Sequence, residues 1–480
     1  MFDQSFSAKN IEVIFNTENR KGHIDYSRMP QAYKDCVTDI HAFRAEMKAY
    51  NRKKKTTWTD AEKADYNLDK QIVDLLLKEK QQVLQKEFET VERMINNHDF
   101  SFTINVSDYG GKQYFSIDNG VWAQFYAMKI LLRNLVHLFN VEMVNRHSIM
   151  TSLKLLLNTQ RPLYIIRTDI SGFFESIPQQ RLLRLVERNS LLGTKSKSMV
   201  KKVIFEYERI KDTGRVPAGQ GVPRGIGISS PLSEIYMDRI DKIIRDKREV
   251  VFYVRYVDDI FLILSSLGDA RDLKSYYGEL VDLFSKYGLT LQSEGSDKCK
   301  LIDKYSSSVG GVVVEDLAYL GYHLYLKKKD TELKAVFGLS DNRKDRIKKR
   351  IDNCFEHFDY VVKVNPKQAR HDILDGLNIV SGNIRLSKAK SGVKVGFYYN
   401  NDLLDKDDDF AEIQNHLNGK TPNIPANLFD GAAQRAKYET HLSNCLKNID
   451  FKDRWMKRKM YDIGVERLKS IERWLQKDVK

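Results

Sequence analysis

The sequence is poor in cysteine and has no long apolar run. Its four cysteines among 480 residues form no CxxC pair and no metal-binding spacing: Cys36, Cys299, Cys354 and Cys445. This usage predicts a reducing, cytoplasmic setting in which the cysteines are small hydrophobic core residues. No apolar run approaches the length of about 18 residues that a membrane span needs, so we expect no membrane partner. The stretch Met1–Ser5 lacks the features of a signal peptide.

Acidic residues are outnumbered by basic ones, 65 against 79, which gives a formal net charge of +14. Hydrophobic residues make up 42% of the chain, enough for a substantial core, and charged residues make up 30%, as in a soluble protein. The basic excess favours a polyanionic partner, although a well-solvated basic surface has the same composition.

Residues 250–264 form the stretch around which the chain is organised. Two runs rich in β-branched and aromatic residues flank a short polar tip, which predicts a β-hairpin. The tip carries Asp258 and Asp259, whose adjacent charges repel and favour a divalent cation, because hard cations take carboxylate oxygens. An isolated Asp-Asp pair is more often a solvated turn, but these long apolar flanks predict a buried sheet.

A second acidic strand lies upstream. Residues 162–170 have the pattern of a buried strand with an acidic residue, Asp169, near its end. Asp169 lies 89 positions before Asp258. Only folding can bring two such strand ends together. Side by side, they would form a two-metal site of the kind that serves phosphoryl transfer.

Three ordered motifs resemble reverse transcriptases. Tyr256-Val257-Asp258-Asp259 resembles their Tyr-x-Asp-Asp box, and Asp169-Ile170-x-x-Phe173-Phe174 resembles their first catalytic box. The stretch 220–232, with its Gln-Gly-Val-Pro-Arg-Gly start and Ser-Pro-Leu end, lies between them as the family's nucleotide-binding box does. The resemblance covers residues 100–335 and implies an α+β, right-hand polymerase fold with fingers, palm and thumb.

The resemblance implies roles for the residues around the acids. Asp169, Asp258 and Asp259, with the carbonyl of Ile170, would hold two Mg²⁺ ions, with Mn²⁺ as an alternative. Five further residues would contact the incoming dNTP: Phe174, which would exclude a 2′-hydroxyl, Arg224 and Gly225 in the nucleotide-binding box, Lys298, which would protonate pyrophosphate, and Lys112 of a hairpin at 100–118.

Two further stretches resemble elements that hold nucleic acid. Leu320, Gly321 and Tyr322 match the primer grip. A helix starting near Asp341 has one apolar face, and its remaining surface is crowded with cations that would contact backbone phosphates: Arg343, Lys344, Arg346, Lys348, Lys349 and Arg350.

Arg224 departs from the family pattern, which usually has Gln at this position. Gln both accepts and donates hydrogen bonds, whereas Arg only donates and is always charged. Arg224 would therefore bind a triphosphate or a template base edge, and the two alternatives stay open.

We expect four segments. Residues 1–98 are expected to form a helical extension with a long helix, capped by Thr59 or Asp60, and residues 99–335 to form the fingers and palm. Residues 336–404 are expected to form a thumb-like region with a hairpin after residue 376, and residues 405–480 a basic helical tail. The acidic run 405–409 is expected to be a solvated linker.

The chain lacks an HNH-like endonuclease tail, an RNase H acid constellation and the typical retron stretches. Its long helical N-terminus, its helical tail and the stretch 230–237 (Ser-Pro-Leu-Ser-Glu-Ile-Tyr-Met) resemble bacterial defence-associated (abortive-infection, "unknown group") reverse transcriptases. The stretches 382–386 (Gly-Asn-x-Arg-Leu) and 395–400 (Val-Gly-Phe-Tyr-Tyr-Asn) resemble, within that group, one subunit of a two-enzyme type. This implies RNA-directed DNA synthesis in antiphage defence with a non-coding RNA template, a DNA product, and a homo-oligomer or a second reverse transcriptase as partner. Alternatives are a template-independent or protein-primed polymerase, and a non-catalytic RNA-binding scaffold.

Overall fold

A computed structural model of the chain describes residues 2–21, 23–53, 57–142, 145–159, 163–303, 313–329, 332–387, 394–405 and 408–479. The chain divides into two compact units, each built from three segments. Unit 1 comprises Met1–Glu142, Ile170–Asp246 and Gly278–Leu291, and unit 2 comprises Met143–Asp169, Lys247–Tyr277 and Gln292–Lys480. These two units do not test the four consecutive segments expected from the sequence, so that division of the chain stays a prediction.

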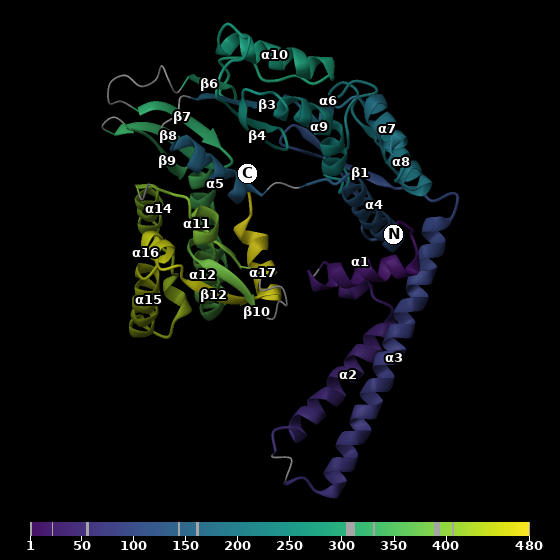
Figure 1. Ribbon diagram of the computed structural model, residues 1–480. Coiled ribbons are helices and arrows are strands. Elements are labelled where there is room, and N and C mark those ends of the chain that lie inside the picture. Colours follow the sequence, from purple (N-terminus) through teal and green to yellow (C-terminus); the bar gives the residue numbers. More distant parts are fainter. Residues whose placement is uncertain are drawn as a thin grey trace. The chain divides into compact units, whose positions relative to one another are not determined.

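Unit 1 begins with three helices, α1 (Ala8–Arg20), α2 (Gln31–Tyr50) and α3 (Asp60–Asn96) (Figure 1). Thr59 caps α3, because its hydroxyl accepts from the amide of Glu62 while the Glu62 carboxylate accepts from the amide of Thr59. This capping box satisfies amides that have no partner within the helix. The expected long helix and its cap at Thr59 are confirmed.

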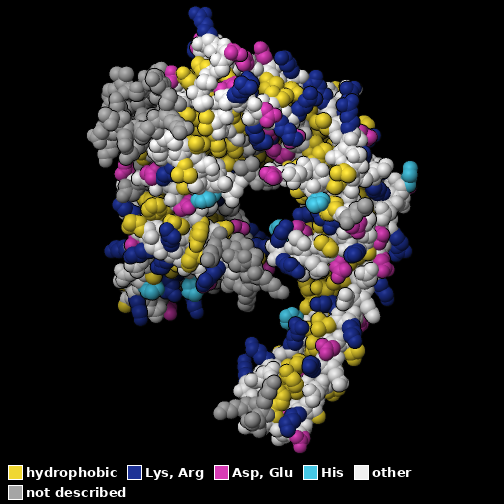
Figure 2. Space-filling model, viewed as in Figure 1, with side chains coloured by type: hydrophobic (Ala, Val, Ile, Leu, Met, Phe, Trp, Pro, Cys, Tyr) yellow, Lys and Arg dark blue, Asp and Glu magenta, His cyan; other side chains and the backbone are white. Residues whose placement is uncertain are grey.

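The second half of α3 is anchored in the core of unit 1. Phe88, Val91 and Ile95, at helical spacing, are buried where α3 meets α1 and α4 (Trp122–Leu138). The first half of α3 pairs with α2 and is far more open, with Leu68 and Leu75 more than half exposed. Figure 2 shows hydrophobic and basic side chains interspersed along this hairpin. Residues 54–56 of its basic connection lie outside the described part.

The rest of unit 1 holds the β1–β2 hairpin and a set of helices. β1 (Ile104–Tyr109) and β2 (Lys112–Ile117) pair antiparallel as predicted. Gly110 and Gly111 both have positive φ, which a two-residue hairpin turn of this kind requires. The helices are α6 (Phe173–Ser176), α7 (Gln179–Arg188), α8 (Thr194–Ile210) and α9 (Ser229–Arg245). Helix α10 (Leu273–Lys286) is divided between the units, with its residues up to Tyr277 in unit 2 and those from Gly278 in unit 1.

Unit 2 contains the sheet on which the acidic residues lie. Its strands are β3 (Tyr164–Asp169), β4 (Val250–Tyr256), β5 (Asp259–Leu264) and β6 (Lys300–Asp303), in the order β4-β5-β3-β6 with every pair antiparallel. Ile165, Ile166 and the run Phe261–Leu264 are buried, as expected for central strands. Residue 162 of the predicted strand lies outside the described residues.

The remainder of unit 2 joins a second sheet to a helical layer. β7 (Val313–Tyr319), β8 (Tyr322–Lys329) and β9 (Glu332–Leu339) form an antiparallel sheet. The helices are α5 (Arg146–Leu157), α11 (Asp341–Val361), α12 (Pro366–Ser381), α13 (Phe397–Asn401), α14 (Asp408–Asn418), α15 (Ala432–Lys447), α16 (Phe451–Met456) and α17 (Val465–Leu475). One hydrophobic core runs from α5 and the sheets to α17.

Two expectations for the C-terminal part were wrong in detail. The tail is not wholly helical, because β12 (Met460–Gly464) pairs parallel with β10 (Asn383–Ser387). The predicted hairpin after residue 376 is shorter than expected, since β11 (Lys394–Gly396) pairs with β10 over three residues and Phe397 then starts a helix. Residue 393, where the second strand was expected to start, lies outside the described residues.

The acidic run is not a solvated linker. Asp405 accepts from the amide of Phe337, and the buried Asp409 accepts from the amide of Leu339, so both carboxylates satisfy backbone amides of β9. Residues 406 and 407 lie outside the described part.

Helices and mainly antiparallel sheets confirm the α+β class. Cys36, Cys299 and Cys354 are buried and Cys445 is partly buried, and all four are free thiols. Within the described ranges, no helix combines the length and the apolar character that crossing a membrane requires.

Candidate active site

The structure places the two acidic stretches directly beside each other. Asp169 at the end of β3 is the register partner of Asp259 at the start of β5, and Asp259 is in turn paired with Tyr256 of β4. Directly opposed residues of antiparallel strands have Cα atoms about 4.5–5.5 Å apart. The side chains of Asp169 and Asp259 therefore point to one face of the sheet, although 89 residues separate them.

Asp258 sits on a strained turn. The two-residue connection between β4 and β5 is Val257-Asp258, and Val257 has a φ of 62°. A β-branched residue rarely adopts positive φ, and the conformation persists only where surrounding contacts hold it. Arg255 supplies such a contact, because its buried guanidinium donates from Nη1 to the carbonyl of Val257 at 2.8 Å.

Two cations neutralise the acids in this structure. Arg167 Nη2 lies 2.9 Å from Asp259 Oδ1, and Lys298 Nζ lies 3.0 Å from Asp169 Oδ2. Gln292 also donates to Asp169 Oδ1 at 3.3 Å. Lys298 was expected near the acids from its motif, whereas Arg167 and Gln292 were missed. Arg167 could have been found from the sequence, because it is a charged residue inside the apolar strand β3 and buried charges require partners.

Burial raises the pKa of Asp259 above its ordinary value. The guanidinium of Arg167 opposes this rise, and the negative charges of Asp258 and Asp169 add to it. Burial likewise raises the pKa of Tyr319, and the charge of Asp259 adds to that rise. A divalent cation bound near these carboxylates would lower the pKa of Asp259 again, because a nearby positive charge favours the charged form of a carboxyl group.

The donor set suits a hard divalent cation, which prefers carboxylate oxygens. Asp169 and Asp259 extend from neighbouring strands and Asp258 from the turn between β4 and β5. Over the described ranges, however, no group of three or more His, Cys, Asp or Glu side chains is placed so that it could hold a metal ion. Asp259 and Asp169 are paired with Arg167 and Lys298. Ile170 is buried and forms a bridge with Leu291.

The predicted primer-grip residues form the tight turn between β7 and β8. Leu320 and Gly321 have φ values of 47° and 88° between the paired residues Tyr319 and Tyr322. Tyr322 is buried, and its hydroxyl donates to the carbonyl of Asn400. The ring of Tyr319 lies 5.0 Å from that of Phe261 on β5, so this turn is packed against the sheet that carries the acids.

The predicted nucleotide-binding residues of unit 1 lie on three elements. Phe173 is buried whereas Phe174, beside it in α6, is only partly buried. Arg224 binds Glu175 through two hydrogen bonds of 3.0 Å, and Gly225 follows it with a φ of 105°. Lys112 is exposed at the tip of the β1–β2 hairpin.

The basic face of α11 is partly engaged within unit 2. Lys344 and Lys348 both bind Glu412 of α14, at 2.8 and 2.5 Å. Arg350 donates to Gln476, Lys349 lies 3.5 Å from Glu356, and the Arg343 guanidinium lies over the Tyr322 ring. Arg346 is exposed to solvent.

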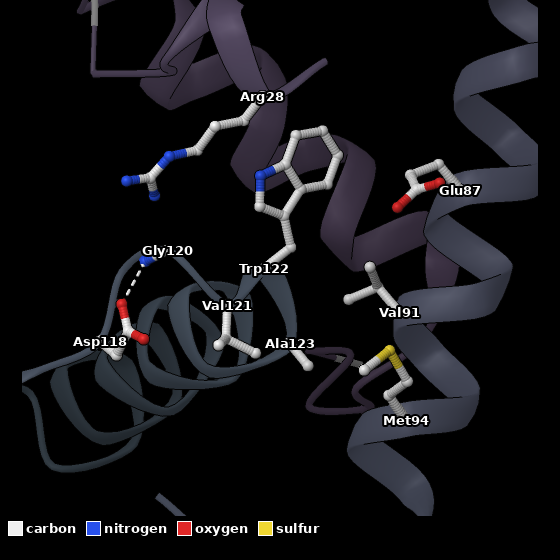
Figure 3. A pocket seen from close by; sticks show the side chains of 9 residues that line it. All are labelled: Arg28, Glu87, Val91, Met94, Asp118, Gly120, Val121, Trp122 and Ala123. Carbon is white, nitrogen blue, oxygen red and sulfur yellow. Dashed lines mark hydrogen bonds between the residues drawn. The ribbon is translucent and has the colours of Figure 1, made fainter. Parts of the chain in front are cut away.

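A pocket of about 600 Å³ lies in unit 1 at the junction of α3 and α4 (Figure 3). Trp122 projects into it, with Arg28 on one side and Glu87 and Val91 of α3 on the other. The residues proposed from the sequence do not line this pocket.

Comparison with known proteins identifies the domain that carries these residues. The family "Reverse transcriptase (RNA-dependent DNA polymerase)" matches residues 124–324, which include both acidic motifs. No curated protein matches the chain.

Similar solved structures include telomerases of two Candida species. Apo Candida tropicalis telomerase truncated from its C-terminal domain is 14% identical, with 57% of this chain and 70% of that chain covered and a TM-score of 0.32. Candida albicans telomerase with a TWJ fragment of telomeric RNA is 12% identical, covering 78% of this chain and 64% of that one, with a TM-score of 0.31. By the family match, residues 124–324 are a reverse transcriptase domain, and the chain is by class an RNA-directed DNA polymerase, a nucleotidyltransferase.

Proposed function

We propose that the chain extends a primer 3′-hydroxyl with dNTPs on an RNA template, with Asp169, Asp258 and Asp259 at the reaction centre. The observation that carries this proposal is the register pairing of Asp169 with Asp259 at adjoining strand ends. Two acidic motifs that are distant in sequence converge there, next to a turn that projects Asp258.

The three carboxylates, with the Ile170 carbonyl, would hold two divalent ions, Mg²⁺ or Mn²⁺. Such ions, when bound, lower the pKa of the attacking hydroxyl and neutralise the leaving pyrophosphate. Lys298 Nζ, 3.0 Å from Asp169 Oδ2, would donate a proton to the pyrophosphate. Arg167 would keep Asp259 oriented, because its guanidinium binds that carboxylate from within β3.

The remaining site residues are assigned to substrate and nucleic acid. Phe174 would exclude a 2′-hydroxyl by its volume, and Lys112 would contact the triphosphate. The Leu320-Gly321-Tyr322 turn would hold the primer. The basic face of α11 would contact backbone phosphates, with Arg346 the most accessible of its cations because Lys344 and Lys348 already bind Glu412.

A role in bacterial antiphage defence, with a non-coding RNA as template, is supported by the resemblance to defence-associated reverse transcriptases. The net charge of +14 suits a nucleic-acid partner. A second copy of the chain or a second reverse transcriptase would complete the system.

The test is a synthesis assay on the purified chain with Mg²⁺, labelled dNTPs and its co-purified RNA. Asp258→Asn should abolish product, whereas Asp238→Asn should not, because Asp238 is an exposed carboxylate bound to Lys242 on α9. Chelation should stop synthesis, and added Mg²⁺ should restore it. Equal product from wild type and Asp258→Asn would refute the proposed centre. Product that still forms after the enzyme and its RNA have been treated with RNase would instead indicate template-independent or protein-primed synthesis.

A further inference from the structure

Arg224, the residue that departs from the reverse transcriptase pattern, is part of a closed ion pair. Its Nε and Nη2 donate to Glu175 Oε1 and Oε2, each at 3.0 Å. The two side chains are 23% and 29% exposed, so water screens the pair only partly. A guanidinium fork that meets a carboxylate in this bidentate way is held in both position and plane.

The pair lies against the aromatic side chain that is proposed to choose the sugar. The Arg224 guanidinium carbon is 5.2 Å from the Phe174 ring centroid and 6.0 Å from that of Tyr114. Both distances fall within the reach of cation–π attraction. Glu175 directly follows Phe174 in α6, so Arg224 contacts the ring while it binds the neighbouring residue.

The backbone around Arg224 is fixed independently of its side chain. The amide of Val222 donates to the carbonyl of Phe174, and the amide of Phe115 on β2 donates to the carbonyl of Arg224, both at 2.8 Å. At Gly225 a Cβ would lie 2.6 Å from the Phe115 carbonyl oxygen. The backbone segments at Gly225 and Phe115 therefore approach so closely that only glycine fits. A change of the side chain at position 224 therefore leaves these backbone contacts in place.

These contacts argue against both roles left open for Arg224 by its sequence. A guanidinium whose charge is neutralised by Glu175 is poorly suited to bind a triphosphate. Two of its donors, Nε and Nη2, are already bound to the carboxylate and so are not available to a base edge. A Gln at this position would leave Glu175 without a counter-charge, because an amide is neutral. Arg224 therefore supplies the positive charge that the Glu175 carboxylate requires.

We propose that Arg224 and Glu175 are positioning residues that fix the ring of Phe174 and thereby set the preference for dNTPs over NTPs. The inference rests on the proposed role of Phe174 in sugar selection. It adds two specificity-determining residues, neither of which touches the sugar itself.

The test compares kcat/KM for a dNTP and the matching NTP. Glu175→Gln and Arg224→Lys should each raise relative NTP use about tenfold, a change typical of altered pocket shape, because each removes the bidentate fork. The exchanged pair, Arg224→Glu with Glu175→Arg, should recover part of the preference. Arg209→Gln should leave the ratio unchanged, since Arg209 forms a similar two-bond pair with Glu206 on α8 but is 71% exposed.

A double-variant cycle shows whether the pair acts through Phe174. Phe174→Ala should itself raise NTP use, and adding Glu175→Gln should then change the ratio no further. A full additional effect of Glu175→Gln in that background would overturn the inference, as would unchanged ratios in both single variants. If kcat/KM falls equally for both nucleotides in both single variants, the pair supports the site as a whole and not the choice of sugar, and this result would also overturn the inference. Absence of synthesis by wild type would instead count against the proposed polymerase activity.

Discussion

Arg167 Nη2 donates to Asp259 Oδ1 at 2.9 Å across the antiparallel pair of β3 and β5. Arg167 is opposite Phe261, two residues along from Asp259, so the contact is a diagonal pair on one face of the sheet. The Arg167 side chain is 11% exposed. An acidic residue of the proposed reaction centre is thus held by a cation of the same sheet.

Loss of Arg167 should destabilise the fold. Arg167→Met would leave the carboxylate of Asp259 in a poorly solvated site without its partner, and we expect a loss of about 1–3 kcal/mol in the free energy of unfolding. Urea denaturation at pH 7 measures this. Adding Asp259→Asn should recover part of the loss, because no charge is then left unpaired. An Arg167→Met variant as stable as wild type would show that the pair has no net effect.

Arg255 should control catalysis through the turn that carries Asp258. Arg255→Lys removes the fork that donates to the Val257 carbonyl, so the strained turn can relax and displace the carboxylate. Small misplacements of reacting groups can cost about 10²-fold in rate, and we expect kcat to fall by 10- to 100-fold with little change in the KM for dNTP. Steady-state kinetics beside the exposed control Arg209→Lys separate this from a general effect of losing an arginine.

Lys298 should act as the proton donor and Lys300 should not. Lys298 reaches Asp169, whereas Lys300 lies within β6 as the register partner of Arg167. General acid catalysis contributes about 10²- to 10⁴-fold, so Lys298→Gln should lower the single-turnover rate by at least about 10²-fold. Lys300→Gln should change it far less. Equal losses in both variants would argue against a specific role for Lys298.

Glu18 should make the stability of unit 1 depend on acid pH. Burial favours the neutral carboxyl, but Lys129, His23 and Lys21 outweigh it and lower the pKa of Glu18 to about 2 from 4.5. Because the folded state holds this proton less tightly than the unfolded state, the stabilisation is present above pH 4.5 and is lost as pH falls toward 2. The shift corresponds to about 3 kcal/mol.

Denaturation of wild type and Glu18→Gln between pH 2 and 7 checks this expectation. The difference in unfolding free energy should be largest above pH 5 and should shrink toward pH 2. A difference that does not change with pH would show that Glu18 contributes by packing and not by charge.

Arg346 should contribute to duplex binding more than Lys344. Arg346 is exposed, while Lys344 is tied to Asp341 and Glu412. Arg346→Gln should weaken binding of a primer–template duplex and reduce the slope of log affinity against log salt by about 1. Anisotropy titrations at several salt concentrations measure this slope. A larger change for Lys344→Gln would contradict the expected order.

Local patterns in the sequence were sufficient to predict several of the helices and strands. The helical spacing that ends in Phe88, Val91 and Ile95, the cap at Thr59 and the hairpin on either side of Asp258-Asp259 all depend on residues near one another in the chain. Their periods follow from backbone geometry, so they can be recognised without knowing the fold. The motif order likewise predicted the reverse transcriptase domain.

Contacts between distant segments required the folded chain. The pairing of Asp169 with Asp259, the Arg167 and Arg224 ion pairs and the parallel pairing of β12 with β10 join residues 49 to 92 positions apart. Strand register and side-chain partners depend on which surfaces are buried together, and no short stretch of sequence records that choice. The sequence therefore identifies the acidic residues and the class of chemistry expected of them, and the packing of the sheets determines which charges hold them in place.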